Sequence, residues 1–140
     1  MKLCNDTITV FNARVDPDEG GNVWTPTVIS GASWFLTDAS TVDASKGGLV
    51  AANKATIRIP ENANTSDKAY TDPLSYADAE DVTGLWTLAA GDIIVKGDAS
   101  ATANPTPAKL KETYADCVTV LGVTDNRRAP NAKHFKVVGT

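Results

Sequence analysis

The chain has 140 residues, of which 42% are hydrophobic and 21% are charged. This length suits one domain, and the apolar content is enough for a buried core and too high for a disordered chain. No apolar run approaches the roughly 18 residues of a membrane-spanning helix, and the first residues lack the apolar stretch of a signal peptide. We therefore expect a single domain over residues 1–140, folded in a cytoplasm and without contact with a membrane.

Charge is distributed unevenly along this chain, whose net charge is −4. An acidic chain is a poor candidate for gripping nucleic acid, which requires a basic surface. The acidic middle could line a passage through which DNA slides without sticking, or it could simply keep a small domain soluble. The middle contains Glu61, Asp67, Asp72, Asp78, Glu80, Asp81, Asp92 and Asp98 with Lys68 and Lys96, whereas the end contains Asp125 with Arg127, Arg128, Lys133 and Lys136.

The beginning of the chain predicts a hairpin. Residues 7–12 alternate polar and apolar side chains, which places Ile8 and Val10 on the buried face of a strand. Residues 16–22 contain proline and paired glycines and predict a turn. A second strand region follows at residues 23–36, so the two regions could pair through a long loop.

The next segments show where strands are interrupted. Pro26 predicts a sheet edge or a strand start, and Gly31 predicts a bulge or bend. Residues 38–48 are small and polar and predict a loop. Residues 51–60 alternate again and predict a strand that Pro60 ends.

Two short helices begin with a capping residue followed by proline. Asp72 precedes Pro73, and we expect that helix to end at Gly84. Thr106 precedes a second proline, and the helix that follows should reach Tyr114.

Taken together, these elements predict a mainly β fold. We expect a small antiparallel barrel or sandwich with long loops and one or two short helices. Residues 92–97 and two segments within 118–139 supply the remaining strands. Loops near residues 38–48, 61–72 and 98–106 should be flexible or become ordered against neighbouring subunits.

Motifs for catalysis or metal binding are weak. His134 is the only histidine and has no second metal-binding residue near it in the sequence. The spacing Asp16-x-Asp18 resembles the start of a calcium loop, but Gly20 and Thr27 stand where that loop requires carboxylates. We therefore expect no enzyme activity, no metal and no cofactor.

Cysteines and tryptophans suit the core better than a site. Cys4 and Cys117 are far apart in sequence, and Cys117 suits a small buried residue in a reducing compartment. Trp24, Trp34 and Trp86 lie in or beside strand patterns and are expected to anchor the core, with a carbohydrate-binding platform as the alternative.

The closing segment, Val118 to Gly139, carries the most informative motif. It contains a strand, then Asp-Asn-Arg-Arg at residues 125–128, then His-Phe-Lys-Val at residues 134–137 before the final glycine. It resembles the C-terminal signature of a family of small, poorly characterised proteins encoded among the head and head–tail genes of tailed bacteriophages and prophages. Weaker similarity to small phage head-completion proteins covers residues 3–10, 54–60 and 88–97.

This resemblance implies a structural protein of the virion neck. Such head-closure (stopper-like) proteins and adaptors form rings of six or twelve subunits between the portal and the tail, and DNA passes through the ring without sequence-specific binding. The implied partners are further copies of the chain, the portal or adaptor, and tail proteins. The alternatives are a tail-terminator, tail-completion or capsid-decoration protein, or a small sugar- or protein-binding β module.

The uneven charge adds a hypothesis about the ring. A basic end on one subunit could pair with an acidic middle on the next, as a closed ring requires. The arginines could instead be solvated. The hypothesis places Arg127, Arg128, Lys133 and Lys136 against Asp78, Glu80 and Asp81 of the neighbour, and it places Asp67 and Asp72 at the channel.

Overall fold

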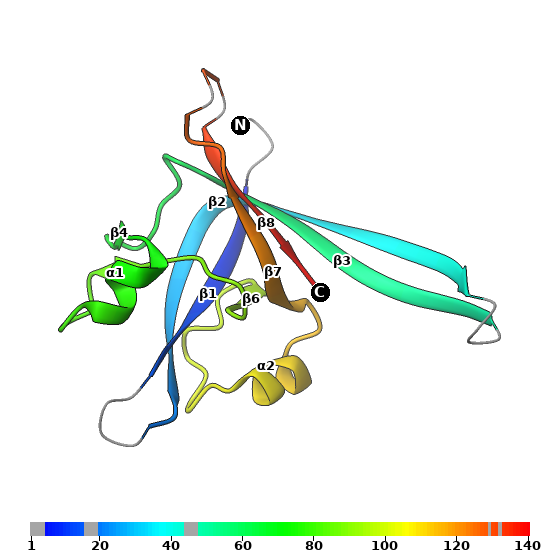
Figure 1. Ribbon diagram of the computed structural model, residues 1–140, viewed down its shortest axis with the longest axis horizontal. Helices are drawn as coiled ribbons and strands as arrows, with labels where there is room; N and C mark the ends of the chain where they lie inside the picture. The colour runs from blue at the N-terminus through cyan, green and yellow to red at the C-terminus, as the bar shows by residue number, and fades with distance from the viewer. Residues whose placement is uncertain (1–4, 16–19, 44–47, 129, 132) are drawn as a thin grey trace.

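The structure is a computed structural model that describes residues 5–15, 20–43, 48–128, 130, 131 and 133–140, with only the backbone described for residues 36–53. Six strands close into a barrel in the order β1-β2-β3-β8-β7-β6, and every neighbouring pair is antiparallel (Figure 1). The predicted mainly β fold is therefore confirmed, and the barrel is the correct alternative. The barrel strands are β1 (Asp6–Val15), β2 (Asn22–Asp43), β3 (Gly48–Pro60), β6 (Ile93–Lys96), β7 (Cys117–Asp125) and β8 (His134–Gly139).

The predicted hairpin joins β1 to β2, and its bulge lies at the predicted glycine. Thr7 lies opposite Ser30, whereas Asp6 lies opposite Ala32, so Gly31 is an extra residue on β2. Gly31 has a φ of 88°, which glycine adopts without strain.

The free edge of β2 confirms the prediction for Pro26. Pro26 lies opposite Phe11 of β1, but β2 pairs with β3 only from Ser33 onward. The missing N–H of proline therefore removes no ladder hydrogen bond. The segment after β3 covers this edge, where Lys68 donates hydrogen bonds to the carbonyl of Pro26 at 2.8 Å and to Oγ1 of Thr27 at 3.0 Å.

Beyond the barrel, β2 and β3 continue as a two-stranded arm, defined here as residues 37–43 and 48–54 (Figure 1). The two strands pair from Ser33 opposite Arg58 to Asp43 opposite Gly48, but β8 pairs with β3 only over residues 55–60. The predicted loop at residues 38–48 is therefore wrong over its described residues. The sequence of residues 38–48 lacks the apolar alternation that identifies a half-buried strand, so the pattern does not indicate this pairing.

The core has two parts. The larger cluster fills the barrel and includes Trp86, which confirms one of the three predicted tryptophan anchors; Trp34 is partly buried against the same cluster. The smaller cluster lies on the outer side of β1 and β6, where Trp24 is partly buried and the chain after β6 covers the barrel. The smaller cluster consists of Phe11, Ile93, Val95, Ala99 and Leu110.

Both predicted helix starts are confirmed. Helix α1 (Pro73–Asp78) is capped by Asp72, and α2 (Pro107–Thr113) is capped by Thr106. The predicted end of the first helix at Gly84 is wrong: α1 ends at Asp78, Ala79 is extended, and Tyr76 is the one buried side chain that holds so short a helix. A parallel two-residue pair, β4 (Ala69–Tyr70) and β5 (Leu85–Trp86), brackets α1.

The other two predicted loops are largely irregular and are hydrogen-bonded to the barrel. Ser30 and Asn64 exchange two backbone hydrogen bonds, of 2.9 and 3.0 Å, across the first loop. In the second loop, the amide of Ala99 donates a hydrogen bond to Oγ1 of Thr9 at 2.9 Å. The hydroxyls of Thr102 and Tyr114 are hydrogen-bonded to each other at 2.7 Å. These contacts lie within one chain, and the flexibility of the loops stays a prediction.

Some of the sequence predictions lie outside the described residues. Cys4, Asp16 and Asp18 are among them, so the structure does not bear on the calcium-loop comparison. Cys117 begins β7 as a free thiol of intermediate exposure that packs against the smaller cluster. Burial raises the pKa of this thiol, which suits an unreactive packing residue.

Candidate functional site

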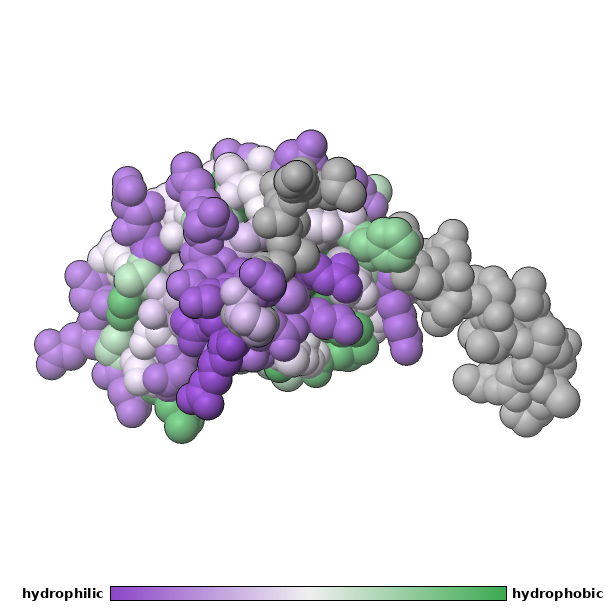
Figure 2. All heavy atoms as spheres, turned by 90° about the horizontal axis from the view of Figure 1, so that it is seen from above, coloured by the Kyte–Doolittle hydropathy of each residue, from purple (hydrophilic) through white to green (hydrophobic). Residues whose placement is uncertain are grey.

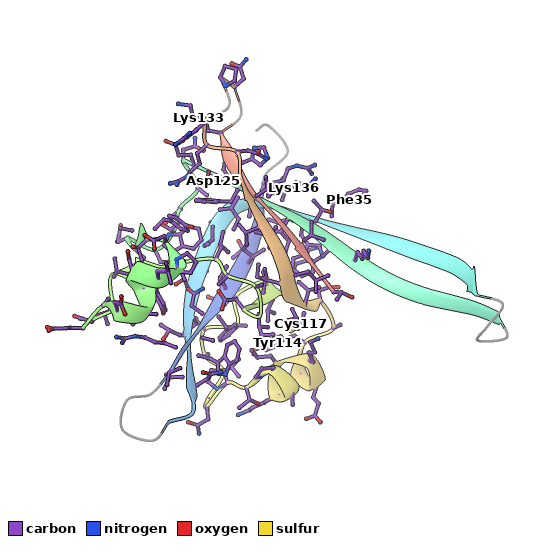
Figure 3. All side chains as sticks on the ribbon, viewed as in Figure 1. Phe35, Tyr114, Cys117, Asp125, Lys133 and Lys136 are labelled. Carbon is purple, nitrogen blue, oxygen red and sulfur yellow. The ribbon has the colours of Figure 1, made fainter. Side chains whose placement is uncertain are left out.

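The connection between β7 and β8 carries three of the four predicted basic residues at one end of the barrel, where Figure 3 labels Asp125 and Lys133. Oδ1 of Asp125 accepts a hydrogen bond from the amide of Arg127 at 3.0 Å, and the amide of Asn126 donates to the carbonyl of His134 at 2.9 Å. An aspartate that binds the backbone two residues on is typical of turns. The sequence Asp-Asn-Arg thus folds the connection back towards β8.

Arg127 is already engaged within its own chain. Its Nε and Nη2 donate to the two carboxylate oxygens of Asp125 at 2.9 and 2.8 Å, in a bidentate pair. The hydrogen bonds from Arg127 lower the pKa of the Asp125 carboxyl, and the same contact raises the pKa of the guanidinium. Both groups therefore stay charged, and the planar fork of Arg127 is fixed in direction.

Three aromatic rings form the surface beneath Arg127. Its Cζ lies 5.0 Å from the ring centre of Tyr70 and 4.6 Å from that of Phe135, within the range of a cation–π contact. Tyr70 also packs on Phe135 at 4.5 Å and on Trp86 at 5.2 Å between ring centres. The β4–β5 pair supplies two of these rings and β8 the third, so the site depends on the barrel closing correctly.

Two hollows adjoin this cluster and share Arg127 and Glu61 in their linings. The first, of about 150 Å³, is lined by the three rings together with the edge of the 60–68 segment. The second, of about 340 Å³, is more polar and is lined by Glu61, Asp125, Arg127, Arg128 and Lys133. The structure thus brings together three of the four predicted basic residues.

The predicted acidic partners lie elsewhere, on and after α1. Asp72 caps the helix by accepting hydrogen bonds from the amide and hydroxyl of Ser75 at 2.9 and 2.8 Å, which lowers the pKa of its carboxyl. Asp81 accepts a hydrogen bond from the amide of Thr83 at 2.9 Å and a second one from its hydroxyl, with the same effect on its pKa. Asp78 ends α1.

The remaining predicted residues are placed by their strands and turns. Glu80 and Asp67 are exposed, and Asp67 has a φ of 62° in the turn before β4. Lys136 lies on the outer side of β8, because its neighbours Phe135 and Val137 point into the core. None of these three lines the Arg127 hollows that the structure describes.

Sequence reasoning missed a buried polar network around Asp92, which is 3% exposed. Its carboxylate accepts hydrogen bonds from Nδ2 of Asn12 at 2.8 Å and from the amides of Ala89 and Ala13 at 3.0 and 3.2 Å. Burial raises the pKa of Asp92, although these three hydrogen bonds act in the opposite direction. The side chain of Asn12 also accepts a hydrogen bond from the amide of Thr87 at 3.2 Å and donates one to the carbonyl of Thr87 at 2.6 Å.

This network ties the chain after β5 to β1, across more than 70 residues of sequence. All of its carboxylate oxygens face donors of the protein itself, so its geometry is that of a structural support. Across the described residues, no group of three or more His, Cys, Asp or Glu side chains is arranged to hold a metal ion. The Arg127 cluster presents charged side chains around three aromatic rings. This arrangement suits the binding of another molecule.

Comparison with known proteins establishes the family. The model of a family of unknown function, DUF6751, matches residues 3–140. The chain belongs to that family. No curated protein and no solved structure matches the chain. Among the described residues of this DUF6751 member, none of the helices has the length and apolar character required to cross a membrane.

The two adjacent arginines are expected to differ in their effect on stability. Arg127→Ala should lower the free energy of unfolding by about 1 kcal/mol, because it removes a partly exposed ion pair and a contact with two rings. Arg128→Ala should change it little, because Arg128 is exposed. Urea unfolding of the two variants measures the difference, and equal values would show that the ring contact contributes nothing.

Proposed function

We propose that this protein is a structural subunit of the neck of a tailed-bacteriophage virion, in a head-closure or head–tail connector ring around the DNA channel. Its partners would be further copies of the chain, the portal or adaptor on one side and tail proteins on the other. The closing segment 118–139 supports this proposal through its resemblance to phage head and head–tail proteins.

The arm is the observation that carries the proposal. Within the described residues, its two strands pair only with each other once they leave the barrel, and Figure 1 shows them projecting well away from the body. An isolated two-stranded hairpin is marginally stable in water, and each edge of it offers unpaired backbone groups. A long arm of this kind is most useful to a protein that packs against neighbours.

Other roles fit the geometry less well. A sugar-binding platform built on tryptophans would expose their ring faces, but Trp86 is 3% exposed and Trp34 packs against the core. Tail-terminator, tail-completion and capsid-decoration proteins are structural roles that differ from a connector in position and symmetry.

Cryo-electron microscopy of particles that contain this chain tests the proposal directly. We expect density for the chain in a six- or twelve-fold ring between the portal and the tail. A position on the capsid surface or at the tail end would contradict the connector assignment, and absence from the particle would contradict a virion role altogether.

Removing the arm should separate assembly from folding. In this variant Asn-Gly replaces residues 39–52, so that a two-residue turn joins Asp38 to Asn53, which already lie opposite each other. The melting temperature should change little because the barrel keeps its core, whereas incorporation into particles should fall at least about tenfold, equivalent to 1.4 kcal/mol. An arm-less protein that enters particles normally would show that the arm has another role.

A further inference from the structure

The outer surface of the barrel is covered on one side and bare on the other. Over β1 and β6, the outward side chains of Phe11 and Val95 are buried beneath Leu110 of α2 and its flanking chain. Over β2 from Ser33 onward, β3, β8 and the part of β7 after Val120, no described helix lies on the outside (Figure 1). We call this second surface the bare face.

Strand register identifies the residues of the bare face. Phe35 lies opposite Thr56, and Thr56 lies opposite Val138, so the three form one row across β2, β3 and β8. Gly122 of β7 lies opposite Val138 and ends the row, and Leu121 is the unpaired residue beside it at the irregularity of β7. Phe35 is 60% exposed and Leu121 is 53% exposed, although both belong to the barrel strands. Figure 2 shows apolar surface beside the point where the arm leaves the body, among several smaller apolar areas on a largely hydrophilic face.

The neighbouring row of the bare face is basic. Arg58 lies directly opposite Lys136, whose other neighbour is Thr124, and Lys54 is exposed further along β3. Figure 3 shows Lys136 and Phe35 close to the root of the arm. Like charges in a directly opposed pair destabilise a sheet. A partner that supplies carboxylates would offset this repulsion.

The chain itself carries a surface of matching character. Leu74 of α1 is 79% exposed, which is the largest exposure among the large apolar side chains described. Asp78 lies one helical turn further along on the same side of α1, and exposed Glu80 and Asp81 follow it. We call this the α1 ridge. It pairs one apolar side chain with three carboxylates, as the bare face pairs apolar side chains with three basic groups.

We infer that the bare face binds the α1 ridge of a second copy of this chain. Figure 1 shows α1 and the arm on opposite sides of the barrel, so one molecule cannot satisfy both surfaces itself. Contacts between two different surfaces are head to tail, and they close into a ring when the rotation permits. This inference rests on the proposed function in that it takes a second copy as the partner.

The inference also changes which basic residues face the acids. The sequence hypothesis used Arg127, Arg128, Lys133 and Lys136, of which this inference keeps only Lys136; Arg127 already pairs with Asp125 and contacts two rings. Arg58 and Lys136 face each other across the strands, and among the described residues neither forms an ion pair. Asp78, Glu80 and Asp81 keep the role that the sequence hypothesis gave them.

A charge exchange tests the pairing in solution. Sedimentation velocity over a range of concentrations should show self-association of the full chain, weakened by salt. Arg58→Glu with Lys136→Glu should raise the dissociation constant at least tenfold, and Asp78→Lys with Glu80→Lys should do the same. The protein that carries all four changes should associate again, because the charges then match in the opposite sense.

Matched controls separate the interface from general effects of charge. Lys96→Glu with Lys111→Glu changes the net charge equally at exposed sites outside the bare face and should leave association unchanged. Phe35→Ser should weaken association, whereas Val23→Ser, also on β2 and 50% exposed, should not. Circular dichroism and urea unfolding verify that each variant is folded.

Several results would overturn this inference. They are a wild-type chain that stays monomeric at every concentration, reversed charges without effect, or a fourfold variant that does not recover. Each of them leaves the location of the chain in the particle as a separate question. A ring in the neck combined with failed charge exchange would keep the proposed function and reject this interface.

Discussion

Asp92→Ala is expected to lower the free energy of unfolding by about 3 kcal/mol, one of the two largest effects we expect of a single substitution in this chain. The change leaves the amide group of Asn12 and the backbone amides of Ala13 and Ala89 without their acceptor in a buried place. Buried donors that lose their partner cost their full desolvation energy. Urea unfolding at neutral pH measures the loss.

A matched control lies at the other end of β6. Asp98 is exposed and accepts hydrogen bonds from the nearby amide and hydroxyl of Ser100. Asp98→Ala should therefore have little effect on stability. Equal losses in the two variants would contradict a special role for the buried network.

The pH dependence of stability tests the charge state of Asp92. Burial raises its folded pKa above the unfolded value of about 3.9, so the folded state binds the proton more tightly. The contribution of Asp92 is therefore full below about pH 3.9 and is lost as the pH rises through the folded pKa. Asp92→Asn cannot titrate and serves as the reference.

We expect the stability of the wild type minus that of Asp92→Asn to fall as the pH rises from about 4 to 7. Urea unfolding at several pH values gives this difference directly. A difference that grows with pH would mean that the three hydrogen bonds outweigh burial and lower the folded pKa.

Asp92 also shows what a sequence cannot reveal about an acidic residue. In the sequence it is one of eight acids between residues 61 and 98, and composition treats them alike. Asp92 differs from the other acids because β1 places two donors beside it, the side-chain amide of Asn12 and the backbone amide of Ala13, from about 80 residues away. One local feature hints that Asp92 is buried: it comes directly before the apolar run of β6, and residues next to such a run are more often buried.

The predictions that succeeded depend on local physics. Helix caps need only a side chain and an amide three residues on, as for Asp72 and Thr106. The bulge at Gly31 and the strand end at Pro60 follow from backbone conformations that those residues favour or exclude. Such features do not require knowledge of the rest of the fold.

The arm and the Arg127 cluster were not predicted, because neither follows from the local sequence pattern. Residues 38–48 have the small, polar composition of a loop, and only the register of β2 with β3 reveals strand pairing over residues 38–43 and 48. The choice of Asp125 and two rings as partners for Arg127 depends on the β4–β5 pair lying beside β8. The bare face is likewise defined only by register, which places Arg58 against Lys136.

Gly139→Ala is expected to destabilise the barrel by about 2–3 kcal/mol, because no space exists for a methyl group at this position. A Cβ there would lie 2.8 Å from the carbonyl oxygen of Thr119 and 2.9 Å from Cγ2 of Val118. Gly139 pairs with Ala55 on one side and with Val120 on the other, so neither strand can retreat without opening the barrel. Thermal or urea unfolding of the variant measures the cost.

Gly122 provides the control for this substitution. It lies on β7, opposite Val138, and a Cβ there would meet no atom within 4 Å. Gly122→Ala should therefore leave stability nearly unchanged, and equal losses in both variants would contradict a steric cause. The glycine that closes the sequence motif at residues 118–139 thus has a physical reason: it lets the last strand approach β7 closely enough for the barrel to close. That closure also sets the register that aligns Phe35 with Val138 and Arg58 with Lys136, so a loosened barrel should lose the bare face together with its stability.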